Sequence, residues 1–539
     1  MTNNQSLAKW QTDCIDKLIE SNCAKLLLII KNNNPSKRCV PKYQKIISKN
    51  FFYTLWNRFL LKISGEIRTS FENQFKNIPI LNCITTFTTK YAEHFNVKDL
   101  NEISNYKLDF ILRFGFNIIK GDILTLPKYG VWSYHHGDEM KFRGGPAGFW
   151  EIYFNVPTTG VILQRLTEKL DAGIIIEKRI YKTINYSYSE LKNKLLLANT
   201  DMPLVAVKKI LTTGFNPLTI SSTEAKIFTF PTNWQMMRFC FRLFKARLYF
   251  YFNSYFLAEQ YGLALINNVS NSYIIPKNRF INKQLLHPKK NIFYADGFLF
   301  SNENKNYCVC EKYDYTNEKG SLVLIEIDES FKKETILLES SSHHSYPYTF
   351  KHDGNIYIIP ETAANNCLKL YQLNKDNTLA LISIIIENFA AIDSSIIYYD
   401  DYFWLFCGNK NDYPNEKLFL FYSKTLTGSY VPHIQNPIKV NPAGSRNAGN
   451  IIIENGAIIR PGQYSVNFYG EKIILNKVDK LTPSSYSESY ESEISSETLQ
   501  KNWKGIHTIS TTKSLLLIDF KYHTFIWKSF IAKLKRKIK

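Results

Sequence analysis

The residues best suited to chemistry lie between Ser133 and Asp171. His135 follows an apolar segment, and Asp171 comes 36 residues later, after a Gly-, Pro- and Arg-rich loop, Trp150 and the sequence Thr159-Gly-Val. A histidine titrates near neutral pH, so it can accept a proton from an attacking nucleophile, and a carboxylate can orient and stabilise the imidazolium that forms. These residues are therefore candidates for a general base and the acid that orients it.

These motifs resemble the catalytic core of the formyltransferase family, over residues 5 to about 215. The family's Asn-x-His, its Arg-Gly loop with a proline, and its Thr-Gly-Val strand leading to an Asp are matched here, with His135 and Asp171 as the catalytic pair. The resemblance implies a one-carbon transferase that uses 10-formyltetrahydrofolate as co-substrate and no metal. It also implies a second group of residues that contact substrate or folate: His136, Asp138, Arg143, Gly144, Trp150 and Thr159.

Some features of this region admit a second interpretation or depart from the family's pattern. His136 and Asp138 also fit a solvated histidine and a turn-stabilising aspartate. Ser133 stands where the family has the Asn that polarises the formyl carbonyl, and a hydroxyl can donate only one hydrogen bond to a developing oxyanion. The family's fold opens on a buried strand, whereas this sequence enters almost directly at a helix containing Trp10 and Gln11. Either the start lies too late or that strand is absent, and both would weaken the folate-side pocket.

The elements that must position this site alternate between strand and helix patterns. Continuous apolar runs at 25–31, 108–112 and 129–134 are typical of buried parallel strands, and the last of them ends at the histidines. Another strand is expected over 159–166, and Ser187-x-x-Glu190 predicts the start of a helix. The pattern indicates an α/β domain with a Rossmann-like open parallel sheet, in which ligands bind at the carboxyl ends of the strands.

From about residue 260 the sequence changes to short strands separated by turns. Three pairs of segments keep a spacing of 15 residues between their first and last members: Asp296 with Glu311, Tyr346 with Glu361, and Asp393 with Gly408. A fourth copy near 447–462 fits with a slip of one residue, and segments near Gln260 and His507 would complete the set. Strand–turn–strand repeats offset by roughly 50 residues are typical of propeller blades. The sequence therefore predicts an all-β five-bladed propeller.

Polar motifs in this half resemble the propeller at the N-terminus of the plant glucosamine inositolphosphorylceramide transferase family, which is itself similar to five-bladed glycoside hydrolases. The matching pieces include Ser345-Tyr-Pro, Pro360-Glu361 and Arg460-Pro-Gly-Gln. The resemblance implies a sugar-binding site where equivalent residues of successive blades meet at the central axis. The residues expected there are Asp296, Glu361, Asp393, Arg446, Asn447, Arg460 and His507. Asp296, Glu361 and Asp393 could form a hydrolase acid/base set, or they could only satisfy turn amides.

The composition indicates which partners and which cellular compartment to expect. The net charge of +20 suits an anionic partner, but the lysines are dispersed, and an AT-rich genome would give the same balance. The segments 234–256 and 527–539 interleave basic and aromatic residues, which fits interfacial helices on an anionic membrane; a helix packed between two domains is the alternative for 234–256. The nine cysteines lack zinc spacing and no signal peptide is evident, so a cytoplasmic protein, peripheral at the inner face of the membrane, is expected.

The sequence thus predicts four parts: a formyltransferase-like catalytic domain at 1–215, a helical linker at 216–255, the propeller at 256–526 and a basic tail at 527–539. The expected activity is formyl transfer to an amino sugar, nucleotide-linked or on a glycan precursor, in surface polysaccharide biosynthesis. Two alternatives stay open. One is a methionyl-tRNA formyltransferase, although a propeller would replace the small tRNA-contacting β-barrel of that family; no DNA partner is expected. The other is a glycan-binding protein whose catalytic half is degraded.

Overall fold

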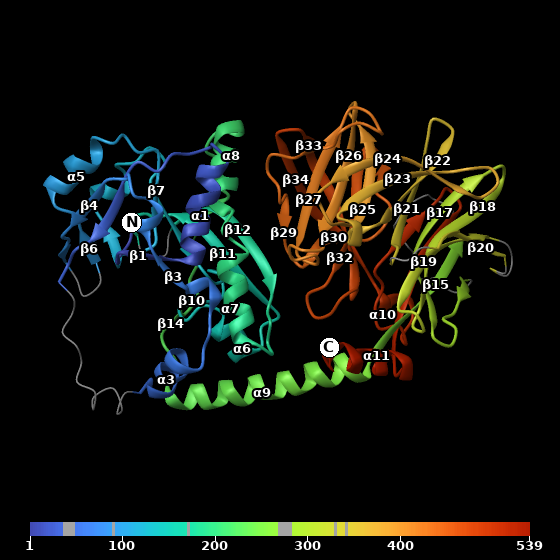
Figure 1. The fold of residues 1–539 in the computed structure, drawn as a ribbon, viewed down its shortest axis with the longest axis horizontal. Coiled ribbons are helices and arrows are strands. Elements are labelled where there is room, and N and C mark those ends of the chain that lie inside the picture. Colours follow the sequence, from blue (N-terminus) through green and yellow to red (C-terminus); the bar gives the residue numbers. More distant parts are fainter. Residues whose placement is uncertain are drawn as a thin grey trace. The chain divides into compact units, whose positions relative to one another are not determined.

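The computed structural model describes residues 1–35, 49–88, 92–169, 173–221, 223–267, 283–327, 331, 333–339 and 343–538. The chain forms two compact units, residues 1–248 and 249–539, and the boundary falls inside the long helix α9 (Asn233–Phe256). Unit 1 mixes strands and helices, and unit 2 is mostly antiparallel sheet (Figure 1). In the described part of the chain, no helix is long and apolar enough to span a membrane.

A five-stranded sheet holds the catalytic motifs of unit 1. Its order is β13 (Thr219–Ile220), β12 (Ile174–Lys182), β11 (Thr158–Arg165), β9 (Val131–His135) and β7 (Ile111–Arg113). β7 and β9 run parallel, whereas β9 with β11 and β11 with β12 form antiparallel pairs. The predicted α/β class is confirmed, but the sheet is mixed rather than wholly parallel. The short connection from β11 to β12 accounts for the antiparallel pairing of these two strands, because parallel neighbours need a long crossover.

Residues Met1 and Thr2 lie between two strands of unit 1. The Met1 amine donates to Leu112 O at 2.7 Å, and Thr2 N donates to Ile30 O at 3.0 Å. Leu112 belongs to β7, and Ile30 belongs to β2 (Ile29–Asn32), which runs parallel to β4 (Ile80–Cys83). The strand position expected ahead of the first helix is therefore occupied here by Met1 and Thr2. β1 (Ser6–Ala8), which pairs with β3 (Arg68–Ser70), leads from them into α1 (Lys9–Glu20).

The remaining elements of unit 1 surround these strands. The helices are α3 (Phe51–Phe59), α4 (Phe71–Gln74), α5 (Val97–Ser104), α6 (Phe149–Phe154), α7 (Tyr188–Leu197) and α8 (Met202–Thr213). Two small sheets complete the unit, one from β5 (Thr86–Phe87), β6 (Ala92–His94) and β8 (Ile118–Lys120), the other from β10 (Arg143–Gly144) and β14 (Ile227–Phe228). The predicted helix start at Ser187 is confirmed, because its Oγ accepts from Glu190 N at 3.4 Å at the beginning of α7.

Unit 2 contains five antiparallel sheets, each with a core of four strands, so the predicted five-bladed propeller is confirmed. Blade 1 is β16 (Lys283–Leu286), β15 (Ala258–Asn267), β36 (Leu515–Thr524) and β35 (Ile509–Thr511). Blade 2 runs from β17 (Ile292–Asn302) through β18 (Lys305–Asp314) and β19 (Lys319–Glu326) to β20 (Glu334–Leu338). Blade 3 comprises β21 (Ser345–His352), β22 (Asn355–Glu361), β23 (Cys367–Leu373) and β24 (Leu379–Glu387).

Blades 4 and 5 follow the same plan with one extra short strand each. Blade 4 contains β25 (Ala391–Tyr399), β26 (Tyr402–Asn409), β27 (Lys417–Ser423) and β28 (Val431–Pro432), and β29 (Lys439–Val440) also pairs with β27. Blade 5 contains β30 (Ala443–Asn447), β32 (Ala457–Tyr464), β33 (Lys472–Thr482) and β34 (Ser485–Ser495), with β31 (Ile452–Glu454) on β32. Two further helices are α10 (Ser496–Leu499) and α11 (Trp527–Ile538).

The first and last parts of unit 2 share blade 1, which closes the ring. β15 pairs along its whole length with β36, so ten residue pairs join the beginning of the propeller to its end. In blades 2, 3 and 4 the first strand carries a bulge whose residue has a positive φ: Asp296 at 51°, Tyr346 at 43° and Asp393 at 45°. A bulge re-aims a side chain away from the ladder. The 15-residue repeat seen in the sequence is this bulged strand followed by its hairpin partner.

Candidate functional site

β9 carries the first part of the candidate catalytic site of unit 1. Val131 and Trp132 are fully buried, and Trp132 stacks on Phe110 at 4.3 Å and donates Nε1–H to Tyr129 O at 2.9 Å. These contacts fix the strand just before Ser133 and His135. Side chains alternate along a strand, so Ser133 and His135 point to the same face of the sheet.

Arg113, which the sequence did not single out, lies beside Ser133. The two residues pair in register on β7 and β9, and Arg113 Nη1 donates to Ser133 Oγ at 3.0 Å. Arg113 Nη2 also donates to Phe116 O at 2.9 Å, which holds the guanidinium in place. Because this bond uses a lone pair of Ser133 Oγ, the hydroxyl proton remains available for another acceptor, and the cation makes it a stronger donor. The buried Ser133 is thus arranged as a hydrogen-bond donor.

The ring of His135 is held by the loop that follows it. Its Nε2 lies 3.0 Å from Phe142 O, and a Cβ at Gly137 would come within 2.9 Å of the same nitrogen. Any side chain at position 137 would therefore crowd the ring. His135 is half-buried at the carboxyl end of β9, where a base could meet a substrate in an α/β fold. Its expected partner Asp171 lies outside the described residues.

The Arg-Gly-Pro loop is closed by side chains that the sequence had assigned to ligand contacts. Trp150 Nε1 donates to Gly145 O at 3.1 Å, and Arg143 Nη1 donates to Ala225 O at 3.1 Å. Gly144 has a φ of +82°, and a Cβ there would lie 2.1 Å from Phe228 O, so only glycine permits the β10–β14 pairing. In this structure Trp150, Arg143 and Gly144 shape the loop around the site, and Trp150 closes it.

Asp138 and Thr159 are both buried and both have protein partners. Lys178 Nζ donates to Asp138 Oδ1 at 2.9 Å, and Thr159 Oγ1 donates to Glu151 Oε1 at 2.8 Å. A Cβ at Gly160 would lie 2.9 Å from Asp138 Cα, so the glycine of the Thr-Gly-Val motif allows the loop to approach β11. Burial raises the pKa of Glu151 to about 7, so this carboxyl can hold a proton at neutral pH. These contacts make Asp138 and Thr159 supports of the loop rather than exposed ligand contacts.

His136 points to the opposite face of the sheet from His135. Its ring stacks on Tyr134 at 5.5 Å and meets the edge of Trp10 at 5.1 Å. Its buried Nε2 forms no hydrogen bond within the described residues, and burial, followed by the neighbouring His135, lowers its pKa to about 3. A neutral imidazole against an aromatic cluster is a packing residue. The interpretation of His136 as a solvated side chain is therefore wrong, because its ring packs against Tyr134 and Trp10.

Unit 1 also contains a cavity of about 360 Å³. It is lined mainly by apolar residues of α1, β2, β7 and α8, together with Met1 and Tyr129. Burial lowers the pKa of the Met1 amine beside it to about 5. These residues lie toward the amino ends of β7 and β9, whereas His135 ends β9. The cavity and the candidate catalytic residues therefore belong to opposite edges of the strands.

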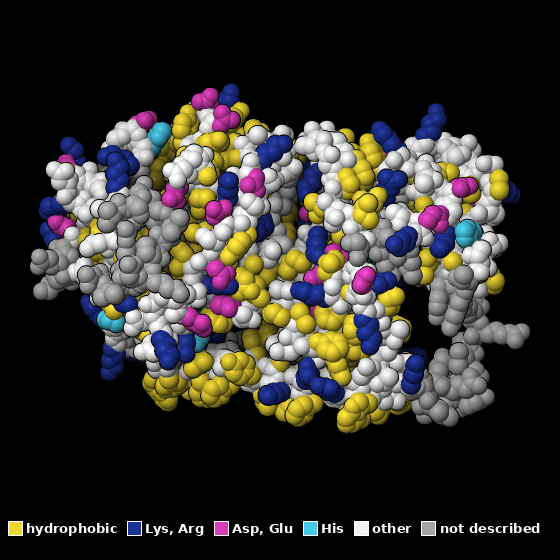
Figure 2. Space-filling model, turned by 180° about the vertical axis from the view of Figure 1, so that it is seen from behind, with side chains coloured by type: hydrophobic (Ala, Val, Ile, Leu, Met, Phe, Trp, Pro, Cys, Tyr) yellow, Lys and Arg dark blue, Asp and Glu magenta, His cyan; other side chains and the backbone are white. Residues whose placement is uncertain are grey.

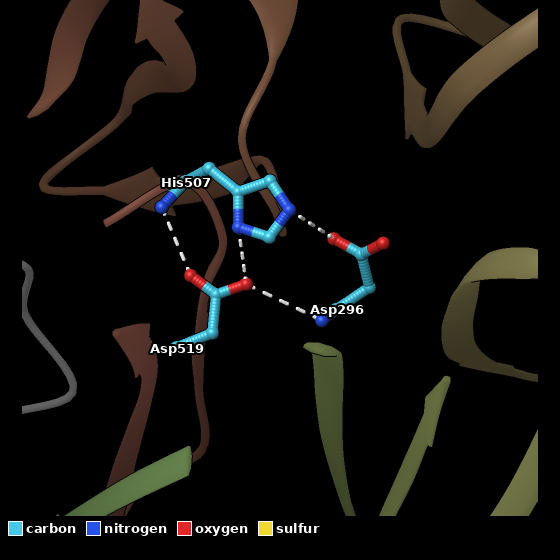
Figure 3. Close-up of side chains that lie close together, drawn as sticks. All are labelled: Asp296, His507 and Asp519. Atoms are coloured by element: carbon cyan, nitrogen blue, oxygen red, sulfur yellow. Dashed lines mark hydrogen bonds and ion pairs between the residues drawn. The ribbon is translucent and has the colours of Figure 1, made fainter. Parts of the chain in front are cut away.

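In unit 2, the side chains of Asp296, His507 and Asp519 lie close together (Figure 3). His507 Nε2 lies 3.4 Å from Asp296 Oδ1, and His507 Nδ1 forms a close ion pair with Asp519. Asp519 Oδ1 accepts from the backbone N–H of His507 at 2.9 Å, and Asp296 N donates to Asp519 Oδ2 at 3.3 Å. Burial alone would lower the pKa of His507, but Asp519 and Asp296 raise it above its usual range, so the imidazolium balances their charge.

Two further carboxyls reach the axis from the second strands of blades 2 and 3. Glu311 pairs with Ala295 and Glu361 pairs with Ser345, next to the bulged residues Asp296 and Tyr346. Burial and then neighbouring carboxylates raise the pKa of Glu361 to about 8 and that of Glu311 well above its usual range. Glu361 is therefore protonated at neutral pH and can donate a hydrogen bond. Glu361 is half-buried, and its carboxyl accepts no hydrogen bond from the described residues.

Asp393 is held by cations and amides rather than exposed for binding. Arg446 donates to it through Nε and, at 3.2 Å, through Nη2, and Gln463 Nε2 donates at 3.1 Å. Arg460 and Asn447 lie deeper and are fully buried: Arg460 Nη1 donates to Asn447 Oδ1 at 3.0 Å, and its other nitrogens bind Glu488. The expectation that Arg460 and Asn447 line a sugar site is wrong, because both are fully buried in a hydrogen-bond network that joins blade 5 to blade 4.

One group of described residues offers ligand atoms close enough for a metal. Asp296, His507 and Asp519 each present one such atom, and these atoms lie within 4.8 Å of one another. However, both oxygens of Asp519 already accept N–H donors, and His507 pairs with both carboxylates. The histidine therefore supplies the positive charge that a cation would bring.

The sequence did not single out Arg113, Glu151, Asp519 or Glu311 as site residues. For Glu311 a signal was available, because the repeat places it at a fixed spacing from Asp296.

Comparisons with known proteins match the two units to different families. Residues 283–516 match the protein-family model described as glucosamine inositolphosphorylceramide transferase 1, N-terminal. In the same C-terminal region the chain is similar to glucosamine inositolphosphorylceramide transferase 1 of Oryza sativa subsp. japonica, 32% identical over 204 residues, covering 36% of this chain and 27% of that protein. The family 117 glycoside hydrolase Zg3597 of Zobellia galactanivorans is a structural neighbour with a TM-score of 0.32 and 11% identity, covering 50% and 91% of the two chains.

The N-terminal region has formyltransferase homologues. It is 31% identical over 128 residues to the bifunctional polymyxin resistance protein ArnA of Wigglesworthia glossinidia brevipalpis, covering 21% of this chain and 19% of that protein. It is also 31% identical over 131 residues to methionyl-tRNA formyltransferase of Prochlorococcus marinus strain MIT 9515, covering 24% and 39%. The chain thus spans less than half of each of these curated relatives.

Proposed function

We propose that unit 1 transfers a formyl group from 10-formyltetrahydrofolate to the amine of an amino sugar. The observation that carries this proposal is the arrangement on β9, where a half-buried histidine and a cation-supported serine donor share one face at the carboxyl end of the strand. The formyltransferase homologues of the N-terminal region support the reaction class. The name of the rice relative of unit 2 contains an amino sugar, which supports the class of acceptor.

The proposed chemistry assigns each residue one task. The amine attacks the formyl carbon while His135 takes its proton, and the C–N bond to the folate breaks as the tetrahedral intermediate collapses, with His135 returning the proton to the departing folate nitrogen. The Ser133 hydroxyl, polarised by Arg113, donates to the oxyanion of that intermediate. Asp171 would orient the imidazole, as the family resemblance implies. The acceptor is nucleotide-linked or part of a glycan precursor, in surface polysaccharide biosynthesis.

Transfer of isotope from labelled 10-formyltetrahydrofolate tests this proposal against its rivals. A panel of nucleotide-linked amino sugars and amino-sugar glycans should gain label when the protein is present. Label appearing only on methionyl-tRNA, with salt-dependent binding of the tRNA, would favour the tRNA enzyme instead. No transfer to either acceptor, together with glycan binding, would favour a degraded catalytic half.

Replacing Ser133 by alanine should lower kcat by roughly 10²-fold, the usual cost of losing one oxyanion donor. Replacing it by asparagine should keep or raise activity, because the amide restores the donor that formyltransferases have at this position. Single-turnover measurements with saturating acceptor would separate this step from binding. Equal turnover of the Ser133→Ala variant and the unmodified protein would place the donor elsewhere.

For unit 2 we propose that the axis binds the carbohydrate part of the acceptor, with protonated Glu361 as a hydrogen-bond donor. Glu361→Ala should raise the acceptor KM about tenfold with little change in kcat, the sign of lost uniform binding. Glu361→Gln, which keeps a donor, should stay close to the unmodified protein. Affinity should also fall as pH rises through about 8, where the Glu361 proton is lost. An unchanged KM in the alanine variant at all pH values would contradict the assignment.

A further inference from the structure

Large apolar side chains are exposed on one side of α3 and α9 in unit 1. On α9 they are Trp234, Met237, Phe241, Phe244 and Leu248, and on and after α3 they are Phe52, Leu55, Phe59 and Leu60. Trp234 is 71% exposed, Phe241 69% and Phe244 60%. Figure 2 shows hydrophobic side chains gathered along the lower edge, where α9 lies in Figure 1, with Lys and Arg side chains between them. We call these nine residues the outer apolar face.

This face does not take part in packing α9 onto unit 1. The opposite side of the helix does so through Met236 and Phe239, and the Phe239 ring stacks on Phe149 at 4.2 Å. The exposed residues of α9 follow one another at intervals of three and four, so they form a single stripe along the helix. A helix with one apolar stripe packed inward and a second turned outward has a surface left for a partner.

α3 repeats this arrangement next to α9. Its inner residues Tyr53 and Trp56 pack against aromatic side chains of unit 1, and Trp56 meets Phe239 at 5.7 Å. Phe52, Leu55 and Phe59 follow at intervals of three and four on the other side. Phe52 N donates to Asn233 Oδ1 at 3.0 Å, which ties the start of α3 to the start of α9. Both helices therefore present apolar rows to the outside of the same unit.

The charges around the outer apolar face are all positive. α9 contains Arg238, Arg242, Lys245 and Arg247, α3 contains Arg58, and neither helix contains an acidic residue in its described part. Arg238, Lys245 and Arg247 are exposed. Tryptophan and phenylalanine in an apolar row with basic residues beside it are what interfacial helices use on anionic lipid. Four charges in 24 residues also agree with a helix that lies on a bilayer rather than crossing it.

We propose that α3 and α9 bind the surface of a membrane containing anionic phospholipids, with the outer apolar face inserted at the level of the headgroups. The basic residues then meet lipid phosphates while the aromatic rings replace water with acyl chains. Unit 2 carries a second element of the same character, since Trp527 and Phe525 are exposed beside the basic helix α11.

Flotation of the full-length protein with lipid vesicles tests this proposal. The protein should float with vesicles of phosphatidylcholine mixed with phosphatidylglycerol, and much less with phosphatidylcholine alone. The triple variant Trp234→Ser, Phe241→Ser, Phe244→Ser should bind the mixed vesicles on the order of 100-fold more weakly. A matched control changes three exposed apolar residues of the propeller, Ile336→Ser, Leu381→Ser and Tyr490→Ser, and should bind like the unmodified protein.

Two further measurements keep the proposal falsifiable. Arg238→Gln with Lys245→Gln should weaken binding to the mixed vesicles roughly tenfold and leave the weak binding to phosphatidylcholine unchanged. Brominated acyl chains should quench tryptophan fluorescence on binding, and less so in Trp234→Phe. Equal flotation of the triple variant and the unmodified protein would overturn the proposal. So would a self-association that the triple mutation abolishes while neither protein binds vesicles, because the outer apolar face would then join two copies of the chain.

Discussion

Replacement of His135 by alanine is expected to lower kcat/KM for formyl transfer by roughly 10²- to 10⁴-fold, the usual contribution of a general base. The ring is held at the end of β9 by its contact with Phe142 O, so its removal takes away the base without disturbing the buried core of the strand. Transfer of labelled formyl to the best acceptor measures the loss.

Two controls make the His135 result specific. His135→Gln keeps a hydrogen-bond donor toward Phe142 O but cannot take a proton at neutral pH, so it should be nearly as inactive as the alanine variant. Met140→Ala changes an exposed side chain of the same loop and should stay within about twofold of the unmodified protein. Full turnover of His135→Ala on any accepted amino sugar would show that another group takes the proton.

Replacement of Arg446 by methionine is expected to lower the free energy of unfolding of the propeller by about 3 to 5 kcal/mol. The reason is that Asp393, whose side chain is 3% exposed, would lose its bidentate cation and remain as a buried charge. The second substitution Asp393→Asn should recover much of the loss, because it removes that charge. Denaturant unfolding of the full-length protein, with the propeller transition followed separately, gives these values.

An ion pair nearer the surface serves as the control for the Arg446–Asp393 pair. Lys472 and Glu493 join β33 to β34 at 2.6 Å, but their side chains are 22% and 39% exposed. Lys472→Met should therefore cost less than about 1 kcal/mol, because water already screens the pair. If Arg446→Met cost no more than Lys472→Met, Asp393 would have to be neutral or compensated by another group, and Arg446 would not be the cation that balances its charge.

Several features followed from the sequence because they depend on local periodicity. The apolar run before His135 could only be a buried strand, and the structure ends β9 at that residue. The spacing of 15 residues from Asp296 to Glu311 recurs from Tyr346 to Glu361, and it reappears as a bulged strand with its hairpin partner. A strand alternates with a period of two and a hairpin fixes its own register, so neighbouring residues suffice for these predictions.

The apolar stripes of α9 are also visible in the sequence. The sequence does not determine which stripe packs against the rest of unit 1. Both sides of the helix are apolar, so only the docking of Phe239 on Phe149 identified the outer one. His136 illustrates the same limit, since its identity allowed a solvated side chain and only its packing on Tyr134 excluded one.

Only the tertiary structure decided which distant charges meet. Arg113 and Ser133 are brought together by the parallel pairing of β7 with β9, and Asp519 reaches Asp296, 223 residues earlier in the chain, only because β36 closes the ring. The pairing of strands within blade 5 likewise buries Arg460 with Asn447 and Glu488, whereas Glu361 stays half-buried. A residue's type fixes its chemistry, but its charge state and access to a ligand depend on burial and on partners that come from elsewhere in the fold.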